Sequence, residues 1–126
     1  MKIETLHTEK APAAIGPYSQ AVKAGDFLFL SGQIPIDPES GEMVASDITL
    51  QTRQVLYNLQ MVLESQGLGF SNVVETTIFM VDLKDFAVVN RIYQEAMGEH
   101  RPARVTVQVA GLPKEALVEI KMTACF

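Results

Sequence analysis

The clearest feature of the chain is an alternation of apolar and polar residues directly after Pro102. From 104 to 109 the odd positions are valines, and the even positions are Arg104, Thr106 and Gln108. This period of two predicts a β-strand whose valines face the core and whose polar residues face away from it. Arg104 is therefore expected at the start of a strand, on its polar side.

Five other segments have the pattern of strands, namely 2–7, 21–24, 26–30, 73–81 and 117–125. Gly25 predicts a hairpin turn between the second and third of them. The segment 26–30 is apolar almost throughout, which predicts that both of its faces are covered. The last segment alternates again, and its period places Glu119 on the face away from the core.

Two segments, 47–66 and 86–97, repeat their apolar residues at helical spacing. Asp47 and Asp85 stand at their starts, and each is expected to cap its helix. The apolar stripe of each helix predicts a core face. In the first helix, polar residues such as Asn58 are expected to cover the remaining surface.

The predicted order of elements is βββ-α-β-α-ββ, an α+β fold in one domain spanning 1–126. Because two helices cannot cover both faces of a sheet of this size, both are expected on one face. The opposite face is expected to be polar with scattered apolar residues, and to carry Arg104, Thr106, Gln108, Glu119, Lys121 and Thr123. Such an open face suits contact with a second copy, so we expect a homo-oligomer.

Composition narrows the classes of function. The net charge of −5 disfavours nucleic acid and anionic membranes as partners. Hydrophobic residues make up 48% of the chain, which is enough for a core without metal or disulfides. Cys125 is the single cysteine, as suits a reducing cytoplasm. No apolar run approaches the ~20 residues of a membrane helix, and we expect no signal peptide.

Most familiar catalytic motifs are absent from the chain. It has no glycine-rich phosphate loop, no dinucleotide fingerprint and no nucleophile elbow. His7 and His100 have no cysteine or carboxylate near them at metal-ligand spacing, so no metal site is expected. Cys125 has no base near it in the sequence and is expected to be inert.

The remaining candidates are Arg104 and Glu119 on strand faces, with Tyr18 and Ser31 on adjoining loops. A guanidinium group binds a carboxylate through two parallel hydrogen bonds, and a glutamate can activate water. Together they suit hydrolysis of a small carboxylic acid derivative. The pattern alone also allows a structural salt bridge between Arg104 and Glu119, and it favours this second interpretation.

A simple hairpin of the last two strands would separate these two side chains. The face parity of such a hairpin allows Gln108 opposite Glu119, and Arg104 would then lie about 13 Å away along the strand. Either the two strands are not neighbours, or a site at Arg104 takes groups from another subunit.

Several stretches resemble the RidA family, also called the YjgF/UK114 family. They are 11–20 (APAAIGPYSQ), 31–35 (SGQIP), and 102–113 (PARVTVQVAGLP) followed by 118–120 (VEI), and the likeness spans nearly the whole chain. The resemblance implies a chorismate-mutase-like (YjgF-like) fold, with a mixed six-stranded sheet and two helices on one face. It also implies a homotrimer with ligand sites between subunits, and a last strand inside the sheet rather than beside the one before it.

The resemblance further implies an activity, the hydrolytic deamination of 2-imino acids and their enamine tautomers. Substrates of the 2-aminoacrylate and 2-iminobutanoate type would yield 2-oxo acids and ammonia, without cofactor or metal. By the motif, Arg104 would hold the substrate carboxylate and Glu119 would orient or activate the attacking water. The implied substrate-binding residues are Arg104, Tyr18, Ser31, Gly32, Asn90 and Thr106.

Two positions depart from the family pattern. Thr106 stands where many relatives have a cysteine, and Arg101 stands where an aromatic or apolar residue is common. A second positive charge at Arg101 could alter the substrate preference. The competing hypothesis is a non-catalytic trimer that binds small carboxylates or a protein partner, because a fold does not by itself imply chemistry.

Overall fold

The computed structural model describes residues 2–126, which form six strands and two α-helices. The strands are β1 (Ile3–Leu6), β2 (Ala21–Ala24), β3 (Phe27–Leu30), β4 (Val73–Met80), β5 (Ala103–Gln108) and β6 (Val118–Cys125). The helices are α1 (Ile48–Glu64) and α2 (Phe86–Met97). This order agrees with the one expected from the hydrophobic pattern. Within the described residues, neither helix is long and apolar enough to cross a membrane.

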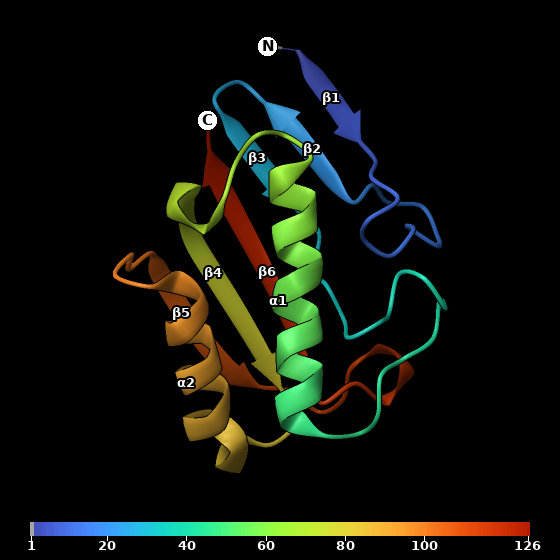
Figure 1. The fold of residues 1–126 in the computed structure, drawn as a ribbon, viewed down its shortest axis with the longest axis vertical. Coiled ribbons are helices and arrows are strands. Elements are labelled where there is room, and N and C mark those ends of the chain that lie inside the picture. Colours follow the sequence, from blue (N-terminus) through green and yellow to red (C-terminus); the bar gives the residue numbers. More distant parts are fainter. Residues whose placement is uncertain (1) are drawn as a thin grey trace.

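The six strands form one sheet in the order β1-β2-β3-β6-β4-β5. β4 and β5 run parallel, and every other neighbouring pair is antiparallel. The last strand therefore lies inside the sheet, as expected, with β4 between it and β5 (Figure 1). The connection from β4 to β5 passes through α2, as a parallel pair requires.

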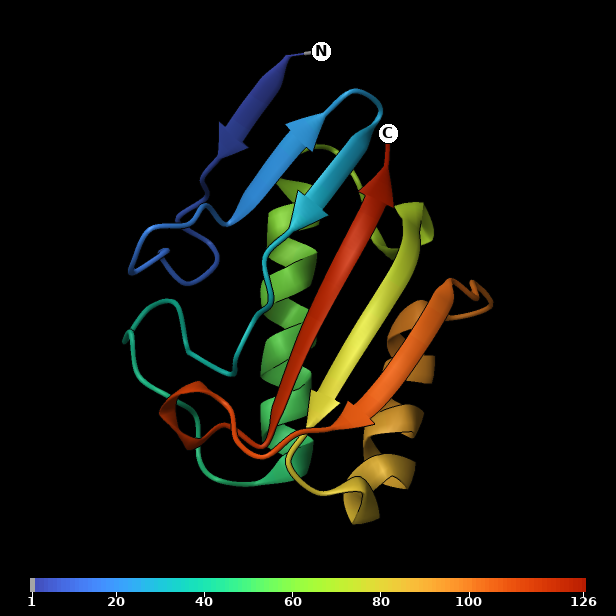
Figure 2. The same cartoon turned by 180° about the vertical axis from the view of Figure 1, so that it is seen from behind.

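Both helices cover the same face of the sheet, and the other face is open (Figures 1 and 2). The Asp47 side chain accepts a hydrogen bond from the Leu50 N–H at 2.8 Å, so the predicted cap of α1 is confirmed. The apolar stripe of α1 faces the sheet and includes Val55, Leu59 and Leu63, all of them buried. Burying this stripe against β6 removes apolar surface from water, which is the main kind of stabilising contribution to a fold.

Two local expectations about the helices are wrong. Asn58 is buried rather than exposed, and its amide donates to the Ile36 carbonyl at 2.9 Å, which ties the loop after β3 to α1. Asp85 makes no capping hydrogen bond. A turn of 3₁₀-helix (Leu83–Asp85) precedes α2, and Asp82 caps that turn instead.

The predicted orientation of β5 is also wrong. Arg104 pairs in register with Thr76, which is buried beneath the helices, so Arg104, Thr106 and Gln108 are on the helix-covered side of the sheet. Val105 and Val107 are on the open face, where they are 51% and 37% exposed. Alternation fixes which residues share a face but not which face is covered. Here α2 lies over the arginine side.

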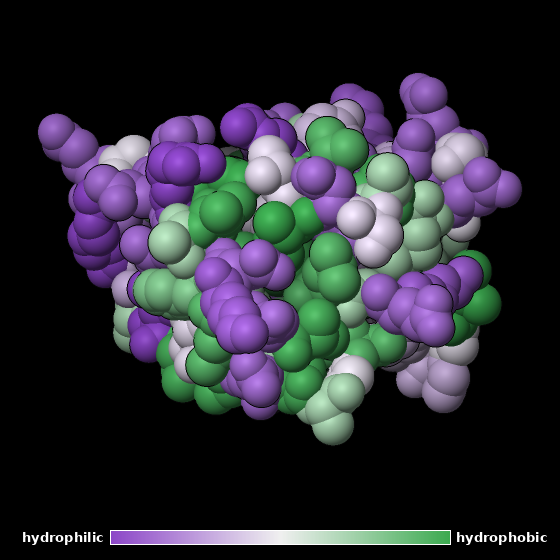
Figure 3. All heavy atoms as spheres, turned by 90° about the horizontal axis from the view of Figure 1, so that it is seen from below, coloured by the Kyte–Doolittle hydropathy of each residue, from purple (hydrophilic) through white to green (hydrophobic). Residues whose placement is uncertain are grey.

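The open face carries more apolar surface than the pattern predicted. Within one chain, the expected cover on both faces of β3 is not formed, because Phe27 and Phe29 are 44% and 43% exposed. Val22 pairs with Phe29 and lies beside it, while Glu119, Lys121 and Thr123 are on this face as expected. Apolar side chains also gather at the end where β4 and β5 finish, interrupted by hydrophilic ones (Figure 3). Exposed patches of this kind are typical of contact surfaces.

Candidate functional site

The first part of the candidate site is built around the Arg104 side chain. Arg104 follows Pro102 at the start of β5, and its Nη1 donates to the Asn90 Oδ1 of α2 at 2.7 Å. Its Cζ lies 5.1 Å from the centre of the Tyr93 ring and 5.6 Å from that of Phe86. Contacts of this kind between a cation and aromatic faces hold the guanidinium in place while leaving its edge free to bind an anion.

Arg104 has no carboxylate partner among the described residues. The single ion pair found in residues 2–126 joins Lys2 and Glu4 at 3.8 Å. The structural salt bridge between Arg104 and Glu119 that the pattern favoured is therefore not formed. Arg104 is exposed, and its guanidinium is held by Asn90 without a carboxylate partner, so its remaining donors are available to a ligand.

A hollow of about 440 Å³ lies on one side of Arg104 and is bordered by Leu83, Phe86 and Thr106. The Thr106 hydroxyl oxygen is buried and has no hydrogen-bond partner among residues 2–126. Leaving a buried polar group unpaired costs free energy, so this hydroxyl has a strong preference for a ligand or a neighbouring chain. Arg104 and Thr106 together could hold a small carboxylate.

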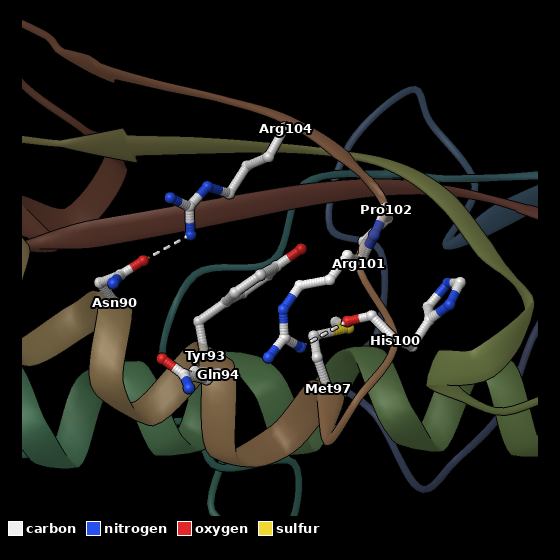
Figure 4. Close-up of a pocket in the computed structure, with 8 residues that line it drawn as sticks. All are labelled: Asn90, Tyr93, Gln94, Met97, His100, Arg101, Pro102 and Arg104. Atoms are coloured by element: carbon white, nitrogen blue, oxygen red, sulfur yellow. Dashed lines mark hydrogen bonds between the residues drawn. The ribbon is translucent and has the colours of Figure 1, made fainter.

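A second cavity, of about 400 Å³, lies on the other side of Arg104, against the last turns of α2 (Figure 4). Its walls are formed by Asn90, Tyr93, Gln94, Met97, His100, Arg101, Pro102 and Arg104. The Tyr93 hydroxyl donates to Thr76 Oγ1 at 2.9 Å in the core. Burial raises the pKa of Tyr93, and the Thr76 hydrogen bond and the charges of Arg104 and Arg101 oppose that rise. Tyr93 is therefore a neutral wall between the two arginines.

The second part of the candidate site surrounds Glu119 of β6. Burial raises the pKa of the Glu119 carboxyl above its ordinary value. No described residue donates a hydrogen bond to it. Gly32 lies directly against it, since a Cβ at Gly32 would stand 2.2 Å from Glu119 Oε2. The chain approaches this closely because Gln33 and Ile120 form a backbone bridge beside them.

The loop 8–20 and the end of β3 carry the other predicted residues of this part. The Ser31 hydroxyl donates to the Ser19 carbonyl at 2.5 Å, and Tyr18 just before it is 54% exposed. Gln20 is buried, and its side chain accepts from the Thr8 N–H and donates to the Thr8 and Pro12 carbonyls. A loop rich in proline is ordered in this way, and it presents the Tyr18 ring to solvent.

The structure thus sorts the predicted residues into two groups that do not meet within one chain. Arg104, Asn90 and Thr106 are on the helix side of β5 and α2, whereas Glu119 is on the open face of β6. β4 lies between the two strands, so they are about 10 Å apart across the sheet. The second group consists of Glu119 and the predicted residues of the adjoining loops, namely Tyr18, Ser31 and Gly32.

The hydrophobic pattern does not indicate the residues that hold these groups in place. Phe86 and Tyr93 belong to the apolar stripe of α2, yet they also support the Arg104 guanidinium. Their spacing from Asn90, four and three residues, could have shown that all three share one helix face. Gln20 carried no signal in the pattern, because its role depends on contacts with distant backbone groups.

The described residues contain no group of three or more His, Cys, Asp or Glu side chains placed to hold a metal ion. His100 lines the second cavity, but its Nε2 donates to the Val73 carbonyl at 2.7 Å. That hydrogen bond assigns the proton to Nε2, because a carbonyl only accepts.

Comparison with protein families gives one match, to the model described as endoribonuclease L-PSP (Ribonuc_L-PSP), over residues 8–126. A RutC family protein of Pyrococcus horikoshii is 53% identical over 121 residues, covering 96% of each chain. The chloroplastic Reactive Intermediate Deaminase A of Arabidopsis thaliana is 48% identical over 124 residues. That alignment covers 98% of this chain and 66% of the Arabidopsis protein.

Solved structures agree with the fold. The yjgF gene product of E. coli superposes with a TM-score of 0.90 at 43% identity, covering 97% of this chain and 98% of its own. E. coli TdcF, solved with bound serine, superposes with a TM-score of 0.92 at 40% identity and covers 98% of both chains. The expected YjgF-like fold, a six-stranded mixed sheet with two helices on one face, is confirmed.

Proposed function

Because the chain belongs to the endoribonuclease L-PSP family, the family of the YjgF and RidA proteins, we propose that it is a hydrolytic deaminase of reactive 2-imino acids. Its substrates are acids of the 2-iminobutanoate type, and enamines such as 2-aminoacrylate after tautomerisation. Water adds to the C=N carbon, the C–N bond breaks, and a 2-oxo acid and ammonia leave. One relative of high identity is named a reactive intermediate deaminase.

The observation that carries the proposal is the unpaired Arg104 guanidinium beside the unpaired Thr106 hydroxyl. The free edge of Arg104 suits a bidentate pair with the substrate carboxylate. Thr106 Oγ1 donates a further hydrogen bond to it, in the position where many relatives have a cysteine. Asn90 holds the guanidinium in the orientation that this binding needs.

Glu119 is the group we propose for activating water. A carboxyl whose pKa is raised by burial takes a proton from attacking water more readily than an ordinary glutamate. The same proton can then go to the departing nitrogen. Gly32 leaves the room that the Glu119 carboxylate and a water need, while Tyr18 and Ser31 line the cleft.

This chemistry requires a second copy of the chain, because Arg104 and Glu119 lie too far apart in one copy. We propose a homotrimer in which Arg104, Thr106 and Asn90 of one copy face Tyr18, Ser31, Gly32 and Glu119 of the next. The exposed Phe27, Phe29 and valines of the open face supply apolar surface for that contact. We further propose a cytoplasmic location, which suits a chain with a single cysteine.

A second candidate function is the binding of small amino or oxo acids without chemistry, which the serine bound to the TdcF relative favours. Cleavage of RNA, suggested by the family description, is not proposed. The net charge of −5 opposes the approach of a phosphate backbone.

The test generates 2-aminoacrylate in situ from serine with a pyridoxal-phosphate dehydratase and times the release of pyruvate. We expect the protein to accelerate release over the spontaneous rate, and Arg104→Ala to lower kcat/KM about a hundredfold. Arg91→Ala, an exposed arginine of α2 outside both cavities, is the matched control. Binding of 2-oxobutanoate without any acceleration would refute the deaminase and support the second candidate.

A further inference from the structure

The cavity beyond Arg104 contains a second positive charge, that of Arg101, which the proposed reaction does not use. Arg101 and Arg104 both line it, together with His100, and no aspartate or glutamate does. The chain as a whole has 15 acidic and 10 basic residues, so two neighbouring arginines without an acidic partner run against its overall charge. A concave site lined by one sign of charge concentrates ligands of the other sign.

Arg101 is held in a defined position in this cavity. Its Nη1 donates to the Gly98 carbonyl at 2.5 Å and to the His100 carbonyl at 2.9 Å, both at the end of α2. Among residues 2–126, no hydrogen bond uses its Nε or Nη2 groups. The contacts with the helix end therefore orient the guanidinium and leave donors free for a ligand.

The two guanidinium groups flank the Tyr93 side chain, which separates them (Figure 4). Met97, Pro102 and Gln94 also line the cavity. The cavity thus presents the guanidinium groups of Arg101 and Arg104 at two separate positions. The Tyr93 ring supplies apolar surface between them. That arrangement matches a short hydrocarbon chain with an acid group at each end.

From this arrangement we propose that the cavity binds the side-chain carboxylate of a 2-imino dicarboxylate, with Arg101 as its partner. The inference rests on the proposed function, in which Arg104 holds the carboxylate next to the imine. Arg101 is then a specificity-determining residue. It favours imino acids derived from acidic amino acids over those with a neutral side chain of the same length.

Binding of the product acids tests the inference without any turnover. Isothermal titration compares 2-oxoglutarate with 2-oxopentanoate, which has the same carbon chain but no second carboxylate. We expect 2-oxoglutarate to bind at least about tenfold more tightly, and Arg101→Gln to remove that advantage while 2-oxopentanoate binds as before. Arg101→Lys should keep part of it, and Arg91→Gln, on the exposed side of α2 outside the cavity, should keep all of it.

Equal affinity of the two acids for the unaltered protein would overturn the inference. So would an Arg101→Gln protein that loses both acids equally, because Arg101 would then act only by supporting the end of α2. Thermal unfolding of each variant shows whether the fold is kept.

Turnover separates this inference from the proposed function. An amino-acid oxidase acting on glutamate or norvaline supplies the matching 2-imino acids, and semicarbazide traps what remains unhydrolysed. Hydrolysis of both without preference would refute the Arg101 assignment alone. Absence of hydrolysis with the binding preference intact would refute the deaminase and leave the dicarboxylate site standing.

Discussion

Arg104 and Glu119 lie on opposite faces of the sheet, on strands separated by β4. In the register, Arg104 is level with Thr76, whereas Glu119 is level with Phe79. The two residues best suited to hold and hydrolyse a small acid therefore cannot act on one molecule within one chain.

Mixing two inactive variants should restore activity. Arg104→Ala retains Glu119, and Glu119→Gln retains Arg104, so a site between one copy of each is intact. If equal amounts are unfolded and refolded together, about a quarter of the sites in randomly mixed rings combine both intact residues. We expect about that fraction of the activity of the unaltered protein, measured as pyruvate release from 2-aminoacrylate.

The control is the same two variants mixed without unfolding, which should stay inactive as long as subunits do not exchange. Refolded mixtures that remain inactive, although light scattering shows that they are oligomers, would refute a site shared between copies.

Gly32→Ala should damage activity more than stability. The added Cβ would stand 2.2 Å from Glu119 Oε2, so the flexible carboxylate must move away. We expect kcat to fall at least about tenfold, because a displaced base loses much of its catalytic contribution. The melting temperature should change little.

Gly111→Ala is the matched control for Gly32→Ala, because no atom lies within 4 Å of the added Cβ there. Equal activity of the two variants would show that the position of Glu119 does not matter for the reaction.

The raised pKa of Glu119 has a consequence for stability. A carboxyl whose pKa is higher in the folded chain than in the unfolded one favours folding at low pH. This contribution is lost as pH rises through the folded-state pKa. Glu119→Gln should therefore raise the melting temperature slightly at pH 7, because solvent screens a side chain that is only partly buried.

The gain should shrink as pH falls below the ordinary pKa of a glutamate, since the native side chain is then protonated in both states. Calorimetry at acidic and neutral pH measures the difference. A variant less stable than the parent at pH 7 would contradict burial as the cause of the shift. The same substitution should lower kcat about a hundredfold or more if Glu119 is the base.

Thr106→Val should weaken substrate binding without lowering the stability of the fold. The Thr106 hydroxyl is buried without a partner, so replacing it with a methyl group removes a polar group that gains nothing in the isolated chain. We expect the melting temperature to stay level or rise slightly, while KM for the imino acid rises several-fold. Thr106→Ser, which keeps the hydroxyl, should keep KM. An unchanged KM in Thr106→Val would remove Thr106 from the substrate site.

Local patterns were sufficient to predict most of the elements of this fold. Alternation located the strands, the period of the apolar stripe located both helices, and Asp47 marked the start of α1. The expectation for Asp85 was wrong because a 3₁₀ turn, capped by Asp82, comes first. Asn58 was misplaced because its partners, the backbone groups of the loop after β3, are distant in sequence.

The arrangement of the candidate site could not be predicted from the sequence. Residue chemistry and motif likeness singled out Arg104, Glu119 and Gly32, but the pattern favoured a salt bridge that is not formed. Phe86 and Tyr93 looked like ordinary core residues, since nothing in their spacing shows that a cation lies over them.

The sequence by itself determined which side chains share a strand face, because that depends only on the period of two in an extended chain. Only the tertiary structure decided that α2 covers the Arg104 side of β5, and that β6 lies between β3 and β4. Those choices depend on packing between segments far apart in the chain. They leave Val105 and Val107 exposed, place Arg104 over the aromatic rings of α2, and put Glu119 on the other side of the sheet.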